Sequence, residues 1–151
     1  MDQPDTQYLT FRLAQEEYGV EILKVQEIKG LSAVTPLPNT PAYVRGVMNL
    51  RGTIVPVMDL RARLGMAATE STAFSVIIVV HVDRRVVGLV VDAVSDVLDI
   101  ETADIQPAPD LGGEVEMRGV QSVARADERL VLLLALDAVL AGVDAASGAA
   151  A

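Results

Sequence analysis

The residues of this chain that could carry out acid–base chemistry are a single histidine and several carboxylates. His81 lies inside the apolar run Val76–Val82, which predicts a β-strand, and we expect a strand histidine that faces solvent. Asp92, Asp96 and Asp99 lie close together in the sequence. A carboxylate pair performs acid–base catalysis only where its surroundings separate the two pKa values, and no nearby residue indicates burial. We therefore predict a solvated acidic face here, without a catalytic centre.

The sequence also gives no strong signal for a metal or cofactor site. It contains no cysteine and one histidine, which excludes thiolate sites and histidine clusters. Asp92, Asp96 and Asp99 could offer oxygen ligands to a hard cation, but the segment lacks the glycine and the alternating oxygen donors of an ion-binding loop. No Gly-x-Ser-x-Gly elbow, phosphate-binding loop or Gly-x-Gly-x-x-Gly pattern is present. We predict no metal, no cofactor and no enzymatic activity, with a hydrolase built on the aspartates as the competing class.

The most distinctive local motif is a polar turn, Asn49-Leu50-Arg51-Gly52, between two apolar strands. Gly52 can adopt a positive φ, and the Asn49 side chain can hydrogen-bond the backbone of its own turn. Such a turn would hold Arg51 in a defined position, where its planar guanidinium suits paired hydrogen bonds with a carboxylate. From the spacing alone, a partner contact and a solvated arginine without a role fit the motif equally well.

Composition narrows the classes of function. The chain has 151 residues, of which 51% are hydrophobic and 3% aromatic, and its net charge is −9. The negative charge argues against nucleic-acid binding and against docking on an anionic membrane, and it favours partners with basic patches. The longest central apolar run, Val76–Val80, is too short to span a bilayer, and residues 1–7 lack a basic and apolar signal segment. We expect a cytoplasmic protein that reaches a membrane only through a partner.

Two segments of the chain repeat one another. Gly19–Ile28 and Gly88–Val97 match at almost every hydrophobic position, at an offset of 69 residues. A proline pair follows each segment, and Asp59 and Asp137 mark the ends of matching apolar runs. Chance similarity between valine-rich strands is the alternative interpretation. We interpret the pattern as two copies of one β-rich unit of about 70 residues.

The repeat predicts a mostly β fold. Each half offers about five short strands, and closing so small a sheet into a barrel removes its exposed edges. We expect two barrels packed together, subdomain one at about residues 15–72 and subdomain two at about 73–141. The two subdomains could share the N-terminal strand. The other predicted features are short helices after Asp59 and Asp137, a tight turn at 16–19, hairpins centred on 83–84 and 127–128, and flexible tails at 1–6 and 142–151.

Four ordered motifs closely resemble the CheW family of coupling proteins. They are Glu17–Ile28, Asn39–Pro41, Asn49–Arg61 and Val86–Val97, and the resemblance extends over residues 7–141 as a single CheW-like domain. It implies two SH3-like five-stranded barrels and no catalytic activity. It also implies a non-enzymatic adaptor that couples bacterial chemoreceptors to the histidine kinase CheA, recruited to receptor arrays at the inner face of the membrane.

The resemblance further implies which residues contact each partner. The cytoplasmic hairpin tip of a chemoreceptor would lie in a groove between the barrels, against Val25, Glu27, Ile28, Gly46, Asn49, Arg51, Val76 and Ile77. The regulatory domain of CheA would contact opposite ends of the molecule at Val34, Gln106 and Leu111. Gln106 takes a position that is often basic in relatives, and Leu111 one that is often aromatic.

Several alternatives remain open at this point. Each apolar contact residue could equally belong to an ordinary barrel core. The same module could serve a different two-component pathway, for example one that controls surface motility. A groove between two barrels could also hold a small molecule, which would make the protein a ligand-binding module.

Overall fold

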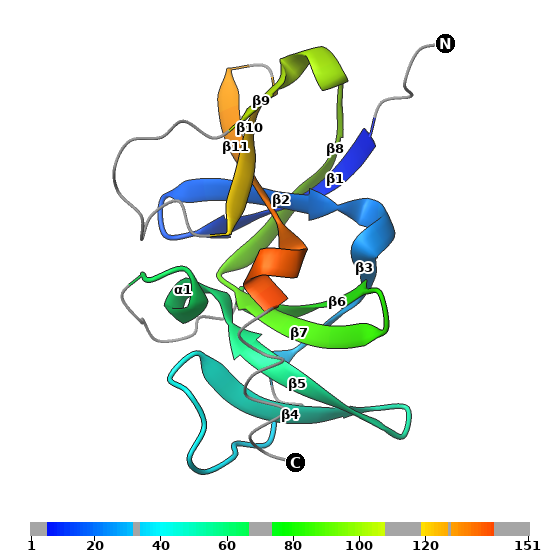
Figure 1. Ribbon diagram of the computed structural model, residues 1–151, viewed down its shortest axis with the longest axis vertical. Coiled ribbons are helices and arrows are strands. Elements are labelled where there is room, and N and C mark those ends of the chain that lie inside the picture. Colours follow the sequence, from blue (N-terminus) through cyan, green and yellow to red (C-terminus); the bar gives the residue numbers. More distant parts are fainter. Residues whose placement is uncertain (1–5, 32–33, 67–73, 108–118, 127, 141–151) are drawn as a thin grey trace.

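A computed structural model of the chain describes residues 6–31, 34–66, 74–107, 119–126 and 128–140. Two small β-barrels lie one above the other along the long axis of the molecule (Figure 1). The mostly β prediction and the pair of SH3-like barrels are confirmed, although one of the two sheets has six strands. The predicted flexible tails lie outside the described residues, apart from residue 6 at the start of the first strand.

The first barrel, drawn uppermost in Figure 1, is a six-stranded sheet in the order β8-β1-β2-β11-β10-β9. Its pairs are antiparallel except β2 with β11, which run parallel. A 3-10 turn, η3 (Thr102–Asp104), precedes the short edge strand β9. The strands are β1 (Thr6–Leu13), β2 (Glu16–Glu21), β8 (Ala93–Ile100), β9 (Ile105–Pro107), β10 (Val120–Ala126) and β11 (Arg129–Leu134).

The second barrel is a five-stranded sheet in the order β3-β6-β7-β5-β4. Again one pair, β5 with β7, is parallel and the rest are antiparallel. Helix α1 (Leu60–Arg63) follows its third strand in the sequence, and a second helical segment spans residues 136–140. The strands are β3 (Val25–Lys29), β4 (Val44–Leu50), β5 (Thr53–Asp59), β6 (Val76–Val82) and β7 (Arg85–Val91).

The barrels do not follow the two halves of the sequence. Strands β1 and β2 join β8 to β11, whereas β3, β4 and β5 join β6 and β7. The sheets therefore differ from the predicted division at about residue 72, because each copy of the repeat gives its first two strands to one barrel and its later strands to the other. Neither copy can bury both faces of its strands alone, and exchanging strands gives each of them a partner surface.

The parallel strand pairs show why the repeat is visible in the sequence. Gly19 of β2 lies opposite Leu133, and Gly88 of β7 lies opposite Val57, so the two repeated glycines occupy equivalent places. At Gly88 a Cβ atom would come within 2.6 Å of Ile77 Cγ2. The close approach of a neighbouring side chain explains the glycine at that position.

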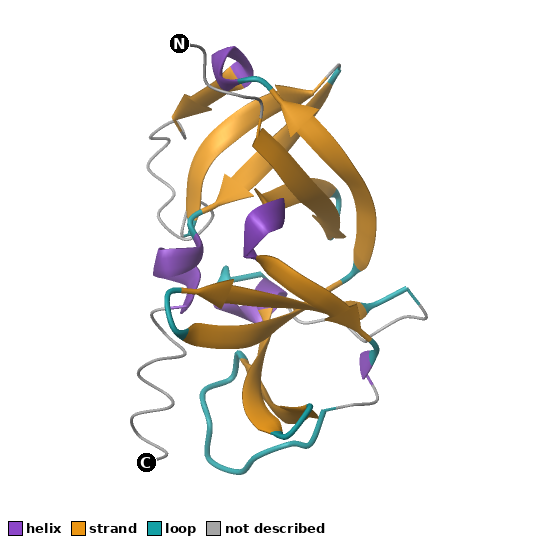
Figure 2. Ribbon diagram, turned by 90° about the vertical axis from the view of Figure 1, so that its right-hand side faces the viewer, coloured by secondary structure: helices purple, strands orange, loops and turns teal. Residues whose placement is uncertain are grey.

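Most buried side chains lie in one cluster that is shared by the two barrels. It combines residues from β1 and β2 with residues from β6 and β7, together with α1 and the segment 136–140. Figure 1 shows both helical segments at the level where the barrels meet, and Figure 2 shows the two-barrel arrangement from the side. Each barrel also has a smaller core of its own. Because the largest core crosses the boundary, the barrels form one packed unit.

Two local predictions differ from the structure. The predicted turn at 16–19 is wrong, because Leu13 pairs with Glu16 and the turn lies at 14–15, with Ala14 at a φ of 57°. The helix after Asp59 is confirmed, and the Asp59 side chain accepts a hydrogen bond from Ala62 N at its start. The last helix begins at residue 136, so Asp137 lies inside it and does not cap it.

The hairpin at 83–84 is confirmed, and residue 127 of the other hairpin lies outside the described part.

No helix within the described residues combines the length and the apolarity that crossing a bilayer requires.

Candidate functional site

The turn between β4 and β5 holds Arg51 as its geometry predicted. Leu50 pairs with Thr53, so Arg51 and Gly52 form a two-residue loop with φ angles of 51° and 89°. Positive φ at both positions is typical of the tight hairpin turn that matches strand twist. Gly52 N donates a hydrogen bond of 2.8 Å to Asn49 Oδ1, which fixes the loop.

Arg51 reaches across the second barrel to Glu27 on β3. Arg51 Nη2 lies 2.6 Å from Glu27 Oε2, and Lys29 Nζ lies 3.5 Å from Glu27 Oε1. The hydrogen bond from Arg51, with the nearby positive charges, lowers the pKa of Glu27. Since β3 and β4 are the two ends of the strand order, this ion pair bridges the two edges of the sheet. The sequence indicated both residues as contacts but not their pairing.

An apolar strip lies on the face of β3 and β6 that looks toward the first barrel, which is the face opposite to the one that carries Glu27. Val25 pairs with Val80 and Ile28 pairs with Ile78, so these side chains share one face. Val76 lies two residues before Ile78 and therefore on that same face. Val25 and Val76 are half-buried against the shared core, whereas Ile28 is 45% exposed. The strip thus leads from the interior to the surface at the junction of the barrels.

Two of the predicted contact residues, Ile77 and Gly46, have roles within the fold itself. Ile77 is completely buried in the core of the second barrel, so its side chain offers no surface to a partner in this structure. Gly46 has a φ of 147°, and a Cβ there would lie 2.1 Å from Thr35 O. Thr35 and Val47 exchange backbone hydrogen bonds of 2.7 and 2.9 Å. Gly46 therefore lets the preceding crossover segment lie against β4.

Two of the three predicted kinase contacts, Val34 and Gln106, lie toward opposite ends of the molecule. The segment from Val34 to Thr40 is drawn at the lower end of Figure 1, and β9, which carries the exposed Gln106, at the upper end. Val34 is half-buried and packs against the core of the second barrel. Leu111 lies outside the described residues.

The acidic segment after β7 is only partly the solvated face that was predicted. Asp96 and Asp99 are exposed, but Asp92 receives hydrogen bonds from Arg61 Nε at 2.9 Å and Arg61 Nη2 at 2.6 Å. Arg61 and Ala14 N lower the pKa of Asp92, against the opposing effect of its partial burial. Among the described residues, no group of three or more histidine, cysteine, aspartate or glutamate side chains could hold a metal ion. His81 is half-exposed on β6.

Sequence reasoning missed the Arg61–Asp92 pair, and the signal for it was the parallel strand pair. Parallel pairing sets Asp59 of β5 opposite Val90 of β7. Arg61 and Asp92 each follow two residues later, which brings them side by side. A reading that treats the aspartates as one sequence cluster cannot find this partner, because the arginine lies 31 residues away.

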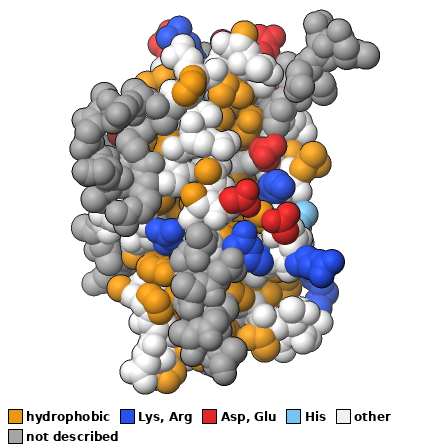
Figure 3. Space-filling view, viewed as in Figure 1, with side chains coloured by type: hydrophobic (Ala, Val, Ile, Leu, Met, Phe, Trp, Pro, Cys, Tyr) orange, Lys and Arg blue, Asp and Glu red, His pale blue; other side chains and the backbone are white. Residues whose placement is uncertain are grey.

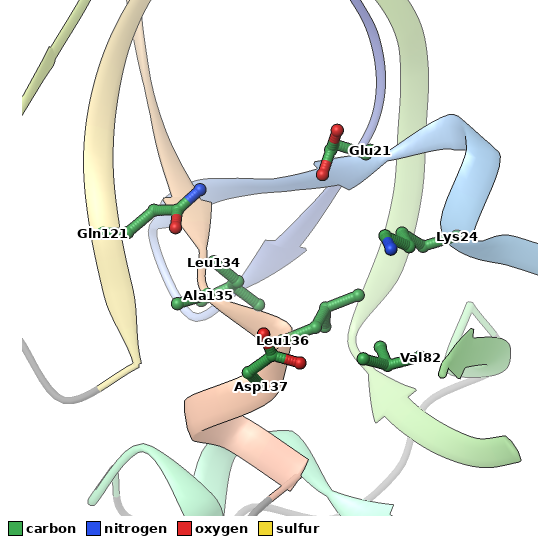
Figure 4. Close-up of a pocket in the computed structure, with 8 residues that line it drawn as sticks. All are labelled: Glu21, Lys24, Val82, Gln121, Leu134, Ala135, Leu136 and Asp137. Atoms are coloured by element: carbon green, nitrogen blue, oxygen red, sulfur yellow. The ribbon is translucent and has the colours of Figure 1, made fainter. Parts of the chain in front are cut away.

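A cavity of about 160 Å³ opens at another part of the barrel junction. Figure 4 shows Glu21 and Lys24 on one side of it and the start of the last helix, with Asp137, on the other. Charged side chains of both signs also gather at mid-height of the surface in Figure 3, at the level where the barrels meet. The junction is thus polar at its surface and apolar inside.

This geometry can be compared with that of known proteins. The family model described as the CheW-like domain matches residues 7–144. The chain belongs to the CheW family. The chemotaxis protein CheW of Rhizobium meliloti is 47% identical over 131 residues, which cover 87% of this chain and 84% of that protein. The probable CheW of Rhizobium etli is 42% identical over 139 residues, covering 92% of this chain and 90% of that protein.

A solved structure agrees with this assignment. The crystal structure of the scaffolding protein TtCheW from Thermoanaerobacter tengcongensis superimposes with a TM-score of 0.80 at 33% identity, covering 86% of this chain and 88% of that one. CheW proteins are non-enzymatic scaffolds that couple receptors and kinase in chemotaxis, and this chain is a chemotaxis coupling adaptor.

Proposed function

We propose that the apolar strip and the Glu27–Arg51 pair together receive the cytoplasmic hairpin tip of a chemoreceptor, while the two ends of the molecule hold the regulatory domain of CheA. The observation that carries the proposal is that exposed Ile28 shares one face of β3 and β6 with half-buried Val76 at the barrel junction. An apolar strip of this kind suits one face of a partner helix, which would bury its own apolar side chains there.

The ion pair lies across the edge strand β3 from the strip, since Glu27 pairs with Val79 and Ile28 with Ile78, and a helix lying over this edge would contact both. Arg51 is 66% exposed even while it contacts Glu27, so its guanidinium still has donors free to meet a carboxylate or a backbone carbonyl on a partner. The tight turn at Asn49 and Gly52 limits the freedom of Arg51, which reduces the entropy lost on binding. Glu27 could at the same time meet a basic side chain of the same helix.

Kinase binding at both ends would leave the strip open to the receptor. The segment around Val34 and the strand that carries Gln106 lie far from each other along the long axis (Figure 1). A kinase domain at either end and a receptor at the middle can then bind together. Several weak contacts of this kind gain strength from the high local concentration in a receptor array. We accordingly place the protein in the cytoplasm, recruited to arrays at the inner face of the membrane.

The test is binding of an immobilised receptor-tip fragment to Arg51→Glu. We expect a loss of affinity of about tenfold or more, because the reversed charge would repel a partner carboxylate at this position as well as the neighbouring Glu27. Arg84→Glu is the matched control, since Arg84 is also exposed at a two-residue hairpin turn, and it should bind as the wild type does. Both variants should still bind the kinase regulatory domain. Unchanged receptor binding by Arg51→Glu would remove this site from the proposal.

A further inference from the structure

The chain passes from one barrel to the other at two equivalent places. After β2 it crosses through the 3-10 turn η1 (Ile22–Lys24), and after β7 it crosses at Asp92. The 69-residue offset of the repeat sets Leu23 in the first crossing against Asp92 in the second. The two crossings can therefore be compared directly.

The second crossing is held from three sides. Asp92 receives two hydrogen bonds from Arg61 on α1, which belongs to the second barrel. Asp92 Oδ2 also accepts a hydrogen bond of 2.8 Å from Ala14 N, in the β1–β2 turn of the first barrel. Asp92 N donates to Arg12 O at 3.1 Å. One aspartate thus connects both barrels at the point where the chain passes between them.

The first crossing is built differently. Leu23 is 82% exposed there, and η1 begins without a side-chain hydrogen bond to its first turn. The cavity of about 160 Å³ lies next to it, lined by Lys24 and by Leu136 and Asp137 of the last helix (Figure 4). Hydrogen bonds to both barrels therefore hold the second crossing, whereas a cavity lies beside the first.

We propose that Asp92 is a positioning residue that, in addition to the shared core, fixes the orientation of one barrel relative to the other. Its consequence for signalling rests on the proposed function: if a receptor at the junction is to alter a kinase at the ends, the body between them must keep its shape. If the two barrels could rotate freely relative to one another, both partners would still bind, but the receptor would no longer alter the kinase. Asp92 touches neither proposed docking surface directly, so it would act only through this orientation.

The first test needs no partner. The chain lacks cysteine, so Thr53→Cys in the second barrel and Asp99→Cys in the first, both at exposed positions, can carry a pair of spin labels. We expect pulsed dipolar spectroscopy to show a broader distance distribution when Asp92→Asn is added. Asp96→Asn, four residues further along the chain at an exposed position on β8, is the control and should leave the distribution unchanged. An unchanged distribution in Asp92→Asn would overturn the proposal.

The second test measures coupling with purified receptor fragment and kinase. Asp92→Asn should bind each partner alone with wild-type affinity and lower receptor-dependent kinase activity about fivefold or more. Full coupling despite a broader distance distribution would overturn the signalling role. If Asp92→Asn does not fold, Arg61→Gln removes the same paired contact from the other side. Failure of the receptor site would appear separately, as normal receptor binding by Arg51→Glu, and would leave the distance result intact.

Discussion

Two arginine–carboxylate pairs in this protein have the same shortest distance and different surroundings. Arg51 and Glu27 approach to 2.6 Å across the mouth of the second barrel, and Arg61 and Asp92 approach to 2.6 Å at the crossing between barrels. The Arg51 side chain is 66% exposed, whereas that of Arg61 is 15% exposed. Distance alone would rank them equal, but burial and additional partners separate them.

The difference indicates what each pair can do. A surface ion pair contributes little to stability, since water and salt screen it, and it can exchange its partner at small cost. A partly buried pair that also binds backbone groups of two elements loses much more when one member is removed. The first pair is therefore suited to meeting another protein, and the second to holding this one together.

We expect the largest loss of stability from a substitution in β4, the strand that leads to Arg51 of the exposed pair. Gly46→Ala would place a Cβ 2.1 Å from Thr35 O and impose a φ of 147° that an L side chain rarely adopts. We expect a loss of about 3 kcal/mol or more in the free energy of unfolding, measured by urea denaturation. Gly30→Ala is the control, because no atom lies within 4 Å of the added Cβ, and it should not destabilise the protein. Equal stability of the two variants would contradict this account of β4.

A smaller loss of stability should follow from breaking the partly buried pair of Arg61 and Asp92. Arg61→Ala leaves Asp92 half-buried with only the Ala14 amide, and we expect a loss of about 1–2 kcal/mol. The same urea titration measures it, with Arg84→Ala as an exposed control that should change little. A loss as small as that of the control would mean that the crossing is held by packing and not by charge.

The sequence predicted the kind of element more reliably than the partners of each element. Valine-rich runs, the Asn49–Gly52 turn and the repeat at Gly19 and Gly88 all depend on local patterns, and each appears in the structure. The exchange of strands between barrels depends on parallel and antiparallel pairs between distant segments, which no local pattern records. That exchange also explains why Asp92 was interpreted as solvated and why the division between the barrels was misplaced.

The candidate site shows the same limit at the level of single residues. Alternation along β6 predicts that neighbouring residues face opposite sides, but not which side faces the core of a barrel. Val76 and Ile77 therefore seemed equally suited to contact a partner. The register of β3 with β6 separates them, since it sets Val76 on the junction face and Ile77 inside the second barrel.

The smallest expected effect is a difference in how the two pairs respond to acid. The pKa of Asp92 lies below its ordinary value near 3.8, chiefly because of its hydrogen bonds from Arg61, and the pKa of Glu27 lies below 4.5 for the matching reason with Arg51. Because both are lower in the folded state, each pair stabilises the protein above the ordinary carboxyl value. That stabilisation is lost as the pH falls through the folded pKa.

The burial of Arg61 and the additional hydrogen bond from Ala14 N should make Asp92 the larger contributor to this acid sensitivity. We expect Asp92→Asn to reduce the fall in melting temperature between neutral pH and pH values below the ordinary carboxyl range, and Glu27→Gln to reduce it less. Added salt should reduce the change that Glu27→Gln makes to this fall in melting temperature, since the Glu27–Arg51 pair is open to solvent. Scanning calorimetry of both variants across this range measures the difference directly. If Glu27→Gln changed the acid response more than Asp92→Asn, the exposed pair would be the structural one, and the assignment of roles to the two pairs would have to be reversed.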